Sequence, residues 1–234
     1  MLAQIKGLPK GDVVDLGCGN GAVGAALATR FEGRKIIGVD SSPAMLAKAQ
    51  QTGNYHALIK ADAATWRPSP PPALIFSNAM CHWLPDHAGL FAGLAALLVK
   101  GGILAVQMPR QFMAPSHQTM RDVAQSLFPD RFDFSGWRPP VAPPQAYARM
   151  LAPLGEARLW ETEYIQRLDP VREGHPVRHF SQSTAMRPIA GKLNKDELAH
   201  FIAAYETDLN SHYPPENDGA VLFPFKRVFF TLRV

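Results

Sequence analysis

The sequence predicts an α/β fold built on a mainly parallel sheet, and three observations support this prediction. Short apolar runs alternate with helical patterns through the first hundred residues. A glycine-rich turn follows the first of these runs, at residues 17–21. The spacing between successive runs leaves room for crossover helices, as in right-handed βαβ units. These features together favour a doubly wound sheet over an all-helical or all-β fold.

Five strands and three helices are expected in this region. The segment Ser41-Ser42-Pro43 starts the second helix, because serine caps helices and proline suits the first helical position. The segment Lys100-Gly101-Gly102 ends the third helix. The expected strands are Asp12–Leu16, Lys35–Val39, His56–Lys60, Ala73–Phe76 and Ile103–Met108, and the expected helices are Ala22–Phe31, Pro43–Gln51 and His87–Val99.

The remainder of the chain loses this alternation. Residues 110–153 contain proline clusters and two helical stretches, and residues 169–220 are polar, helical and loop-rich. Both segments are predicted to be cap insertions over the carboxyl ends of the strands, where open α/β sheets bind ligands. Residues 154–168 and 221–234 alternate like strands, and we expect them to be edge strands of the core sheet. With residues 1–109, they complete a seven-stranded α/β core.

Composition excludes several classes of protein. The chain has 234 residues, of which 47% are hydrophobic and 19% charged, so a disordered chain is excluded. Its longest uncharged apolar run, Ala88–Val99, is shorter than the roughly 18 residues of a membrane span. The N-terminal residues lack a signal-peptide pattern, and two cysteines are too few for a disulfide framework, so a cytoplasmic protein is expected. The net charge of +4 is scattered, and the eight histidines lack metal-binding spacing, so neither nucleic acid nor metal is expected.

The glycine-rich turn is the strongest indication of function. Alternate glycines after a strand let the backbone lie against a ligand, and the following helix directs free N–H groups to the same place. The pattern Gly17-x-Gly19-x-x-Ala22 also fits a dinucleotide site. Asp15 argues against that alternative, because a carboxylate at the carboxyl end of the strand favours a positively charged ligand over a pyrophosphate.

Two further carboxylates follow neighbouring strands. Asp40 ends the second strand, at the position where nucleotide-binding sheets hold the hydroxyls of a ribose. Asp62 follows the third strand, where its side chain suits an adenine amino group and the Ala63 N–H suits a ring nitrogen. The three carboxylates together predict a site for a cationic nucleoside.

The motifs VVDLGCGNG, GVDSSPAML, ADAATW and LIFSNAMCHW occur in the order and spacing of a known family. The chain resembles the class I S-adenosylmethionine-dependent methyltransferases, which have a Rossmann-like fold. The later segments TAMRP and LFPFKR are similar to those of the methyltransferases that act on trans-aconitate. The resemblance implies S-adenosyl-L-methionine as cofactor and a monomethyl ester as product. The cofactor-binding residues expected on this basis are Asp15, Gly17, Cys18, Gly19, Asp40, Ser41, Asp62, Ala63 and Asn78.

A small carboxylic acid as substrate sets different requirements. A carboxylate is already ionised at neutral pH, so methyl transfer to it needs no general base. The carboxylates that do not react need cationic partners, and Arg187 and Arg227 are the candidates. Hydrogen-bond donors are expected from Gln111, His117 and Tyr147, and Trp83 matches an aromatic position at the mouth of the site. His82 is the candidate base if the acceptor is a hydroxyl.

Other interpretations remain open at this point. The acceptor could be a different small molecule or a carrier-bound acyl group. The chain could also bind the cofactor without transferring the methyl group, because relatives begin earlier with a segment that closes over the cofactor. Here residues 2–5 resemble the last turn of that segment. A nicotinamide oxidoreductase is disfavoured by Asp15 and Asp62, and the sequence predicts no oligomeric state.

Overall fold

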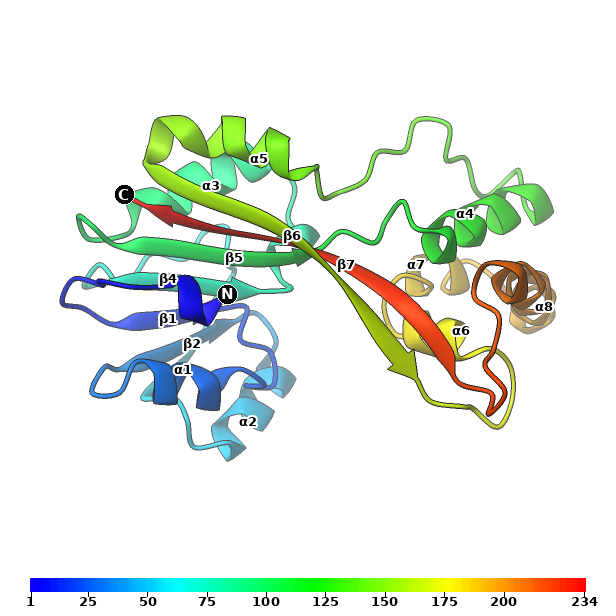
Figure 1. Ribbon diagram of the computed structural model, residues 1–234, viewed down its shortest axis with the longest axis horizontal. Coiled ribbons are helices and arrows are strands. Elements are labelled where there is room, and N and C mark those ends of the chain that lie inside the picture. Colours follow the sequence, from blue (N-terminus) through cyan, green and yellow to red (C-terminus); the bar gives the residue numbers. More distant parts are fainter. The chain divides into compact units, whose positions relative to one another are not determined.

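The computed structural model describes residues 1–234, which form two compact units (Figure 1). The first unit comprises residues 1–109, 140–161 and 227–234. The second comprises residues 110–139 and 162–226. Two long strands contribute residues to both units.

The sheet has seven strands in the order β3-β2-β1-β4-β5-β7-β6. The first five are mutually parallel, and β7 is antiparallel to β5, with Ile103 opposite Arg233 and Pro109 opposite Arg227. The seven-stranded, mainly parallel sheet predicted from the sequence is therefore confirmed. The strands are β1 (Val13–Leu16), β2 (Ile36–Asp40), β3 (Ala57–Lys60), β4 (Leu74–Asn78), β5 (Ile103–Pro109), β6 (Glu156–Leu168) and β7 (Val221–Arg233).

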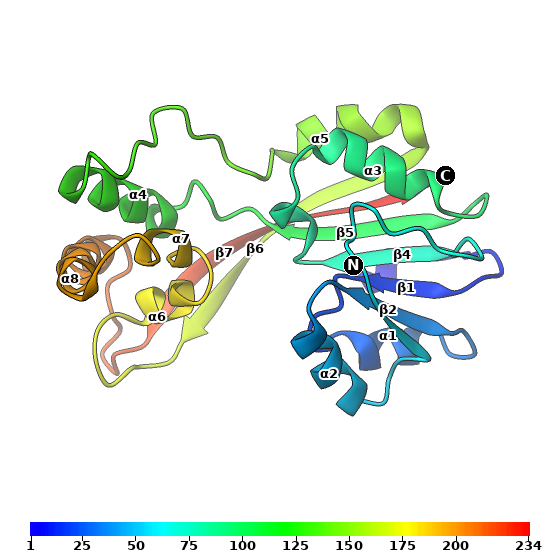
Figure 2. The same ribbon diagram turned by 180° about the vertical axis from the view of Figure 1, so that it is seen from behind.

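In the first unit, one pair of helices packs against the strands at the β3 end of the sheet, and another helix packs against β5. Helices α1 and α2 contact β2, and α2 also contacts β3, whereas α3 contacts β5 and α5 (Figures 1 and 2). The buried strand residues are almost all apolar, which gives the continuous hydrophobic runs expected of parallel strands covered on both faces. The helices are α1 (Gly24–Arg30), α2 (Pro43–Gln51), α3 (His87–Ala96) and α5 (Pro144–Leu151), with short 3₁₀ turns η1 (Leu2–Gln4), η2 (Cys81–Trp83) and η3 (Ala152–Leu154).

The division into units differs from the predicted boundaries. Residues 140–153 were expected in the cap but belong to the first unit, because Tyr147 of α5 is fully buried against Phe91 of α3 and Phe230 of β7. The outer parts of the two edge strands, residues 162–168 and 221–226, belong to the second unit instead of the core. The alternation of apolar and polar residues predicted both strands. It does not indicate at which residue a strand passes from one unit to the other.

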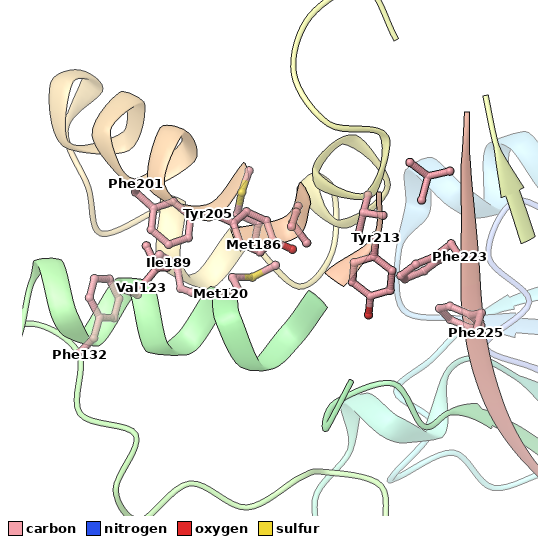
Figure 3. Packing of buried hydrophobic residues seen from close by; sticks show 14 residues of the cluster. Met120, Val123, Phe132, Met186, Ile189, Phe201, Tyr205, Tyr213, Phe223 and Phe225 are labelled. Carbon is pink, nitrogen blue, oxygen red and sulfur yellow. The ribbon is translucent and has the colours of Figure 1, made fainter. Parts of the chain in front are cut away.

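The second unit is a helical cluster with its own hydrophobic core (Figure 3). Its longest helix begins with a capping box, in which Asn194 and Glu197 each accept a hydrogen bond from the other's backbone N–H. Aromatic residues of this helix, including Phe201 and Tyr205, pack against α4. The helices are α4 (Pro115–Leu127), α6 (Pro176–Gln182), α7 (Arg187–Ala190) and α8 (Lys195–His212).

None of the helices in the chain combines the length and the apolar character that crossing a membrane requires. The chain also contains no group of three or more histidine, cysteine, aspartate or glutamate side chains arranged to hold a metal ion.

Candidate functional site

The candidate site lies at the carboxyl edge of four adjacent parallel strands of the first unit. These strands are neighbours in the order β3-β2-β1-β4, so their carboxyl ends meet at the same edge of the sheet. Ligand sites of open α/β sheets form at this edge. All nine predicted cofactor residues are at or just beyond these four strand ends: Asp15, Gly17, Cys18, Gly19, Asp40, Ser41, Asp62, Ala63 and Asn78.

The glycine loop after β1 is shaped by its neighbours. Gly17 has φ +74 and donates its N–H to the Val39 carbonyl at 2.7 Å. A Cβ atom at this position would lie 2.3 Å from Cγ of Met80, which follows β4. Only glycine therefore fits here, because the backbone is left-handed and the Met80 side chain fills the space above it.

Asp40 ties the glycine loop to the start of α2. Its Oδ2 accepts the Gly19 N–H at 2.9 Å, and its Oδ1 accepts the Ser42 N–H at 2.8 Å. Each carboxylate oxygen can accept a further hydrogen bond, and the side chain is half-buried. The structure thus holds this carboxylate in one orientation with acceptor capacity left for ligand hydroxyls.

Asp15 is a buried carboxylate with an unsatisfied oxygen. Its relative exposure is 1%, and its Oδ2 accepts a hydrogen bond from the Tyr55 hydroxyl at 2.7 Å. No group of the protein donates to Oδ1. Burial raises the pKa of Asp15 to about 6, an effect that the Tyr55 hydrogen bond opposes and the nearby Asp40 charge increases. Buried acceptors without a donor are rare in folded proteins, and a ligand that carries a cationic or donor group would satisfy this one.

Cys18 and Ser41 differ in what they leave available to a ligand. The Cys18 side chain is buried, and burial beside Asp15 raises the pKa of its thiol to about 12, so the thiol stays neutral. Only the backbone of Cys18 could meet a ligand. Ser41 is exposed, and its hydroxyl makes no hydrogen bond within the protein.

The remaining cofactor candidates lie at the two outer strands of this group. Asp62 is exposed and accepts the Ala64 N–H at 2.9 Å, whereas the Ala63 N–H has no acceptor. Asn78 is half-buried at the end of β4, and Ala79 after it has φ +56. A left-handed backbone at a residue other than glycine costs energy, so the surrounding structure holds this turn in place.

Arg227 is held at the neighbouring edge of β5 by a buried amide. Its Nη1 donates to Oε1 of Gln107 at 3.1 Å, and Gln107 has a relative exposure of 1%. The Nε2 of Gln107 is buried and donates to no group. The strand register sets Gln107 beside Asn78, so this unused donor belongs to the same edge as the cofactor candidates.

His82 and Trp83 form the turn after β4. Their rings are 4.6 Å apart, and Trp83 has 64% of its surface exposed. Burial, together with the neighbouring His87 and Arg227, lowers the pKa of His82 to about 4. The imidazole is therefore neutral at pH 7, and a base this weak gives little support to the proton-abstraction role considered for His82.

Gln111 and Tyr147 have structural contacts instead of the substrate roles predicted for them. The Gln111 amide donates to the Pro224 carbonyl at 2.7 Å and accepts the Lys226 N–H at 3.0 Å. Tyr147 is fully buried, and its hydroxyl accepts the Ala142 N–H and bonds His87 Nδ1 at 2.7 Å. Because both polar ends are already occupied inside the protein, we do not assign either side chain to substrate binding.

The other two substrate candidates belong to the second unit. His117 is half-buried near Arg121, and these surroundings lower its pKa to about 4. Its Nδ1 is 3.1 Å from Oγ of Ser116. Arg187 begins α7, is exposed, and makes no ion pair. Both side chains keep donors that no group of the protein uses.

Sequence reasoning missed four residues of interest. Tyr55 and Gln107 each contact a predicted residue, and Met80 covers the glycine loop. Arg121 stacks on Trp137 at 3.7 Å and donates to the Phe112 carbonyl, without a carboxylate partner. Only Met80 carried a signal, since it lies within the motif after β4. The other three become visible through contacts between distant segments.

Comparison with known proteins agrees with this geometry. A methyltransferase domain family matches residues 13–102. The trans-aconitate 2-methyltransferase of Azoarcus sp. (strain BH72) is 39% identical over 232 residues, covering 98% of this chain and 89% of the relative. That of Klebsiella pneumoniae (strain 342) is 39% identical over 235 residues, covering 100% and 90%. The chain belongs to the trans-aconitate 2-methyltransferase family.

Solved structures extend the comparison to the fold of this trans-aconitate 2-methyltransferase family member. The YcgJ protein of Bacillus subtilis aligns with TM-score 0.61 at 12% identity, covering 100% of this chain and 95% of that one. A methyltransferase-like protein of Bacillus halodurans C-125 aligns with TM-score 0.59 at 17% identity, covering 99% and 96%. At these identities the likeness establishes the Rossmann-like class I methyltransferase fold alone.

Proposed function

We propose that this protein binds S-adenosyl-L-methionine at the carboxyl edge of β1–β4 and transfers its methyl group to a carboxylate of trans-aconitate, giving a monomethyl ester. The observation that carries the proposal is the unsatisfied Oδ1 of buried Asp15 beside the glycine loop. Family membership supports the choice of acceptor, because the relatives that cover nearly the whole chain carry that name.

The residues at this edge fit the parts of the cofactor. Asp15 would accept a hydrogen bond from the ammonium group of the cofactor. Its Oδ1 has no donor within the protein, and its negative charge complements a cation. Asp40 would accept hydrogen bonds from the ribose hydroxyls, because each of its oxygens receives only one hydrogen bond within the protein, from Gly19 or Ser42. The free Ala63 N–H and the exposed Asp62 carboxylate suit the acceptor and donor groups of adenine. Backbone atoms of residues 17–19, Ser41 and the Asn78 side chain would complete the contacts.

The proposed reaction asks little proton chemistry of the protein. When bound, the cofactor supplies an electrophilic methyl group on a positively charged sulfur. The acceptor carboxylate is ionised at neutral pH, so no residue has to remove a proton. The protein's contribution is to orient the two reactants and to exclude water around them. A neutral His82 is consistent with this, because it presents no competing positive charge to the acceptor.

The carboxylates that do not react need donors. Arg227 and the unused Nε2–H of Gln107 are the candidates in the first unit. Arg187, His117 and Trp83 remain candidates on the grounds given for the sequence, with two unused donors and one exposed aromatic surface among them. A guanidinium fork is the donor best matched to a carboxylate.

The test has two steps. Calorimetric titration with S-adenosylhomocysteine measures cofactor binding, and mass spectrometry then detects a monomethyl ester after incubation with S-adenosylmethionine and trans-aconitate. We expect Asp40→Ala to weaken S-adenosylhomocysteine binding by about 1.5–3 kcal/mol, the loss of charge-assisted hydrogen bonds. Arg187→Ala should raise the KM for the acid and leave cofactor affinity unchanged.

Each result has a definite meaning. Binding followed by ester formation supports the proposal in full. Binding without transfer to trans-aconitate, but with transfer to another acid of a panel, would replace the acceptor and keep the reaction. Binding with no transfer to any acid would support a cofactor-binding protein, and unchanged affinity in Asp40→Ala would remove its ribose role.

A further inference from the structure

Tyr55 occupies a slot that three glycines keep open. A Cβ atom on Gly24 of α1 would lie 2.8 Å from Cε2 of the Tyr55 ring. A Cβ on Gly38 of β2 would lie 3.0 Å from the ring, and one on Gly21 of the loop 3.1 Å. Three segments thus lack side chains at the points where the same ring passes. This convergence fixes the ring, and with it the position of the hydroxyl.

The hydroxyl delivered by this slot reaches the buried Asp15 carboxylate. It donates to Oδ2 at 2.7 Å, across 40 residues of sequence, and leaves Oδ1 without a donor. Burial raises the pKa of Tyr55 as well, so the phenol stays protonated and acts only as a donor to the carboxylate. A donor fixed to one oxygen of a carboxylate both stabilises its ionised form and prevents its rotation.

We infer that Tyr55 is a positioning residue of the cofactor site, which holds Asp15 ionised and turns its Oδ1 toward the ammonium group of the ligand. The inference rests on the proposed function, since it takes the cofactor to be S-adenosylmethionine. It goes beyond that function by assigning a role to a residue outside every motif of the family resemblance. It also gives one reason for glycine at positions 21, 24 and 38.

The ionisation of Asp15 is balanced by the groups around it. Burial and the Asp40 charge on β2 favour the neutral acid, whereas the Tyr55 hydrogen bond favours the carboxylate. Cys18 in the loop is a neutral thiol and adds no charge. With the pKa near 6, the carboxylate is mostly ionised at pH 7.5. Removing the phenolic hydroxyl shifts this pKa upward, so the site would lose its negative charge at a higher pH.

The experiment measures S-adenosylhomocysteine affinity between pH 6.0 and 8.0 for the wild type, Tyr55→Phe and Tyr164→Phe. Phenylalanine keeps the ring in its slot, and Tyr164 is an exposed tyrosine of β6 that serves as the matched control. We expect Tyr55→Phe to bind within about threefold of the wild type at pH 8.0 and roughly fivefold more weakly at pH 6.0, because a one-unit rise of a pKa near 6 lowers the ionised fraction of Asp15 from about one half to about one tenth. Tyr164→Phe should follow the wild type throughout.

A second ligand separates positioning from packing. Methylthioadenosine shares the adenosine and sulfur of S-adenosylhomocysteine but lacks the ammonium group. Its affinity should be the same in the wild type and Tyr55→Phe at every pH. Equal losses for both ligands, or a Tyr55→Phe profile parallel to that of the wild type, would overturn the inference.

The outcome is independent of the acid substrate. A chain that binds S-adenosylhomocysteine with the expected profile but methylates no acid would keep the role of Tyr55 and remove the proposed transfer. If the chain methylates the acid but Tyr55→Phe does not change the pH profile of S-adenosylhomocysteine binding, the proposed function would stand and the role of Tyr55 would be wrong. If the wild type binds neither ligand, both the inference and the proposed cofactor are wrong.

Discussion

The carboxyl edge of the first unit and the tyrosines around Ser116 in the second unit differ in how their buried polar groups are paired. At the carboxyl edge of the first unit, Asp15 and Gln107 each bury a polar atom that has no partner. In the second unit, the Tyr205 hydroxyl donates to the Ser116 carbonyl at 2.7 Å, and the Tyr213 hydroxyl accepts the Ser116 N–H at 3.1 Å. A satisfied buried group stabilises the fold, whereas an unsatisfied one costs stability and indicates a ligand. The contrast separates residues kept for binding from residues kept for structure.

The largest expected effect is that of a substitution at Gly17, in the glycine loop of the carboxyl edge. In Gly17→Ala the new Cβ would meet Met80 on a left-handed backbone, and we expect a loss of roughly 2–4 kcal/mol in the free energy of unfolding. Gly33→Ala is the matched control, because Gly33 has φ +80 but open space around it. Its loss should be about 1–2 kcal/mol. Equal losses in urea unfolding would mean that Met80 does not constrain the loop.

The charge at the edge should reduce stability when no ligand is bound. The pKa of Asp15 is about 6 in the folded protein, against about 3.9 for an unperturbed aspartate, so the folded state holds the proton more tightly. Stability from this group therefore falls as pH rises from about 4 to above 6, by roughly 3 kcal/mol in total. Asp15→Asn removes this loss but leaves an amide N–H unpaired, at a cost of about 1–2 kcal/mol.

We therefore expect Asp15→Asn to be more stable than the wild type by about 1–2 kcal/mol at pH 7.5, with a smaller difference at pH 5. Thermal unfolding of both proteins without ligand measures this. The variant should bind S-adenosylhomocysteine poorly at either pH. An Asp15→Asn protein that is less stable than the wild type at pH 7.5 would show that Asp15 has a structural role and would break the contrast between the units.

The second unit should respond in the opposite direction. Tyr205→Phe removes the hydroxyl that donates to the Ser116 carbonyl and leaves the ring in place. We expect a loss of about 1 kcal/mol in the free energy of unfolding, with S-adenosylhomocysteine affinity unchanged. Urea unfolding and calorimetry on the same preparation give both values. If Tyr205→Phe is more stable than the wild type, the Tyr205 hydroxyl would, like the Asp15 carboxylate, serve a purpose other than folding.

The sequence predicted features that depend on neighbouring residues and missed those that depend on contacts between distant segments. Each strand end of the first unit follows an apolar run along the chain, so Asp15 and Asp40 could be assigned to one edge from local pattern, whereas Asn78 was assigned from the family resemblance. Contacts between distant segments were invisible. Gln111 bonds the Pro224 carbonyl, 113 residues away, and Tyr55 bonds Asp15 across 40 residues. Nothing in either residue's neighbourhood in the sequence indicates its partner.

The boundary between the units shows the same limit. Residues 140–153 contain prolines and a short helix, as do the segments of the second unit, so composition grouped them wrongly. What assigns them to the first unit is the burial of Tyr147 against Phe91 and Phe230. This packing depends on side chains from three separate elements, and no periodicity in one of them predicts it.

The antiparallel pairing of β5 with β7 has a consequence for synthesis. Residues 103–109 form a fully apolar, buried strand apart from Gln107 and the half-buried Pro109, and their outer neighbour is residues 227–233. During translation β5 is synthesised more than a hundred residues before β7. The growing chain must therefore carry an unpaired hydrophobic strand edge while residues 110–226 are synthesised, and such an edge is the kind of surface that chaperones protect and that aggregation exploits.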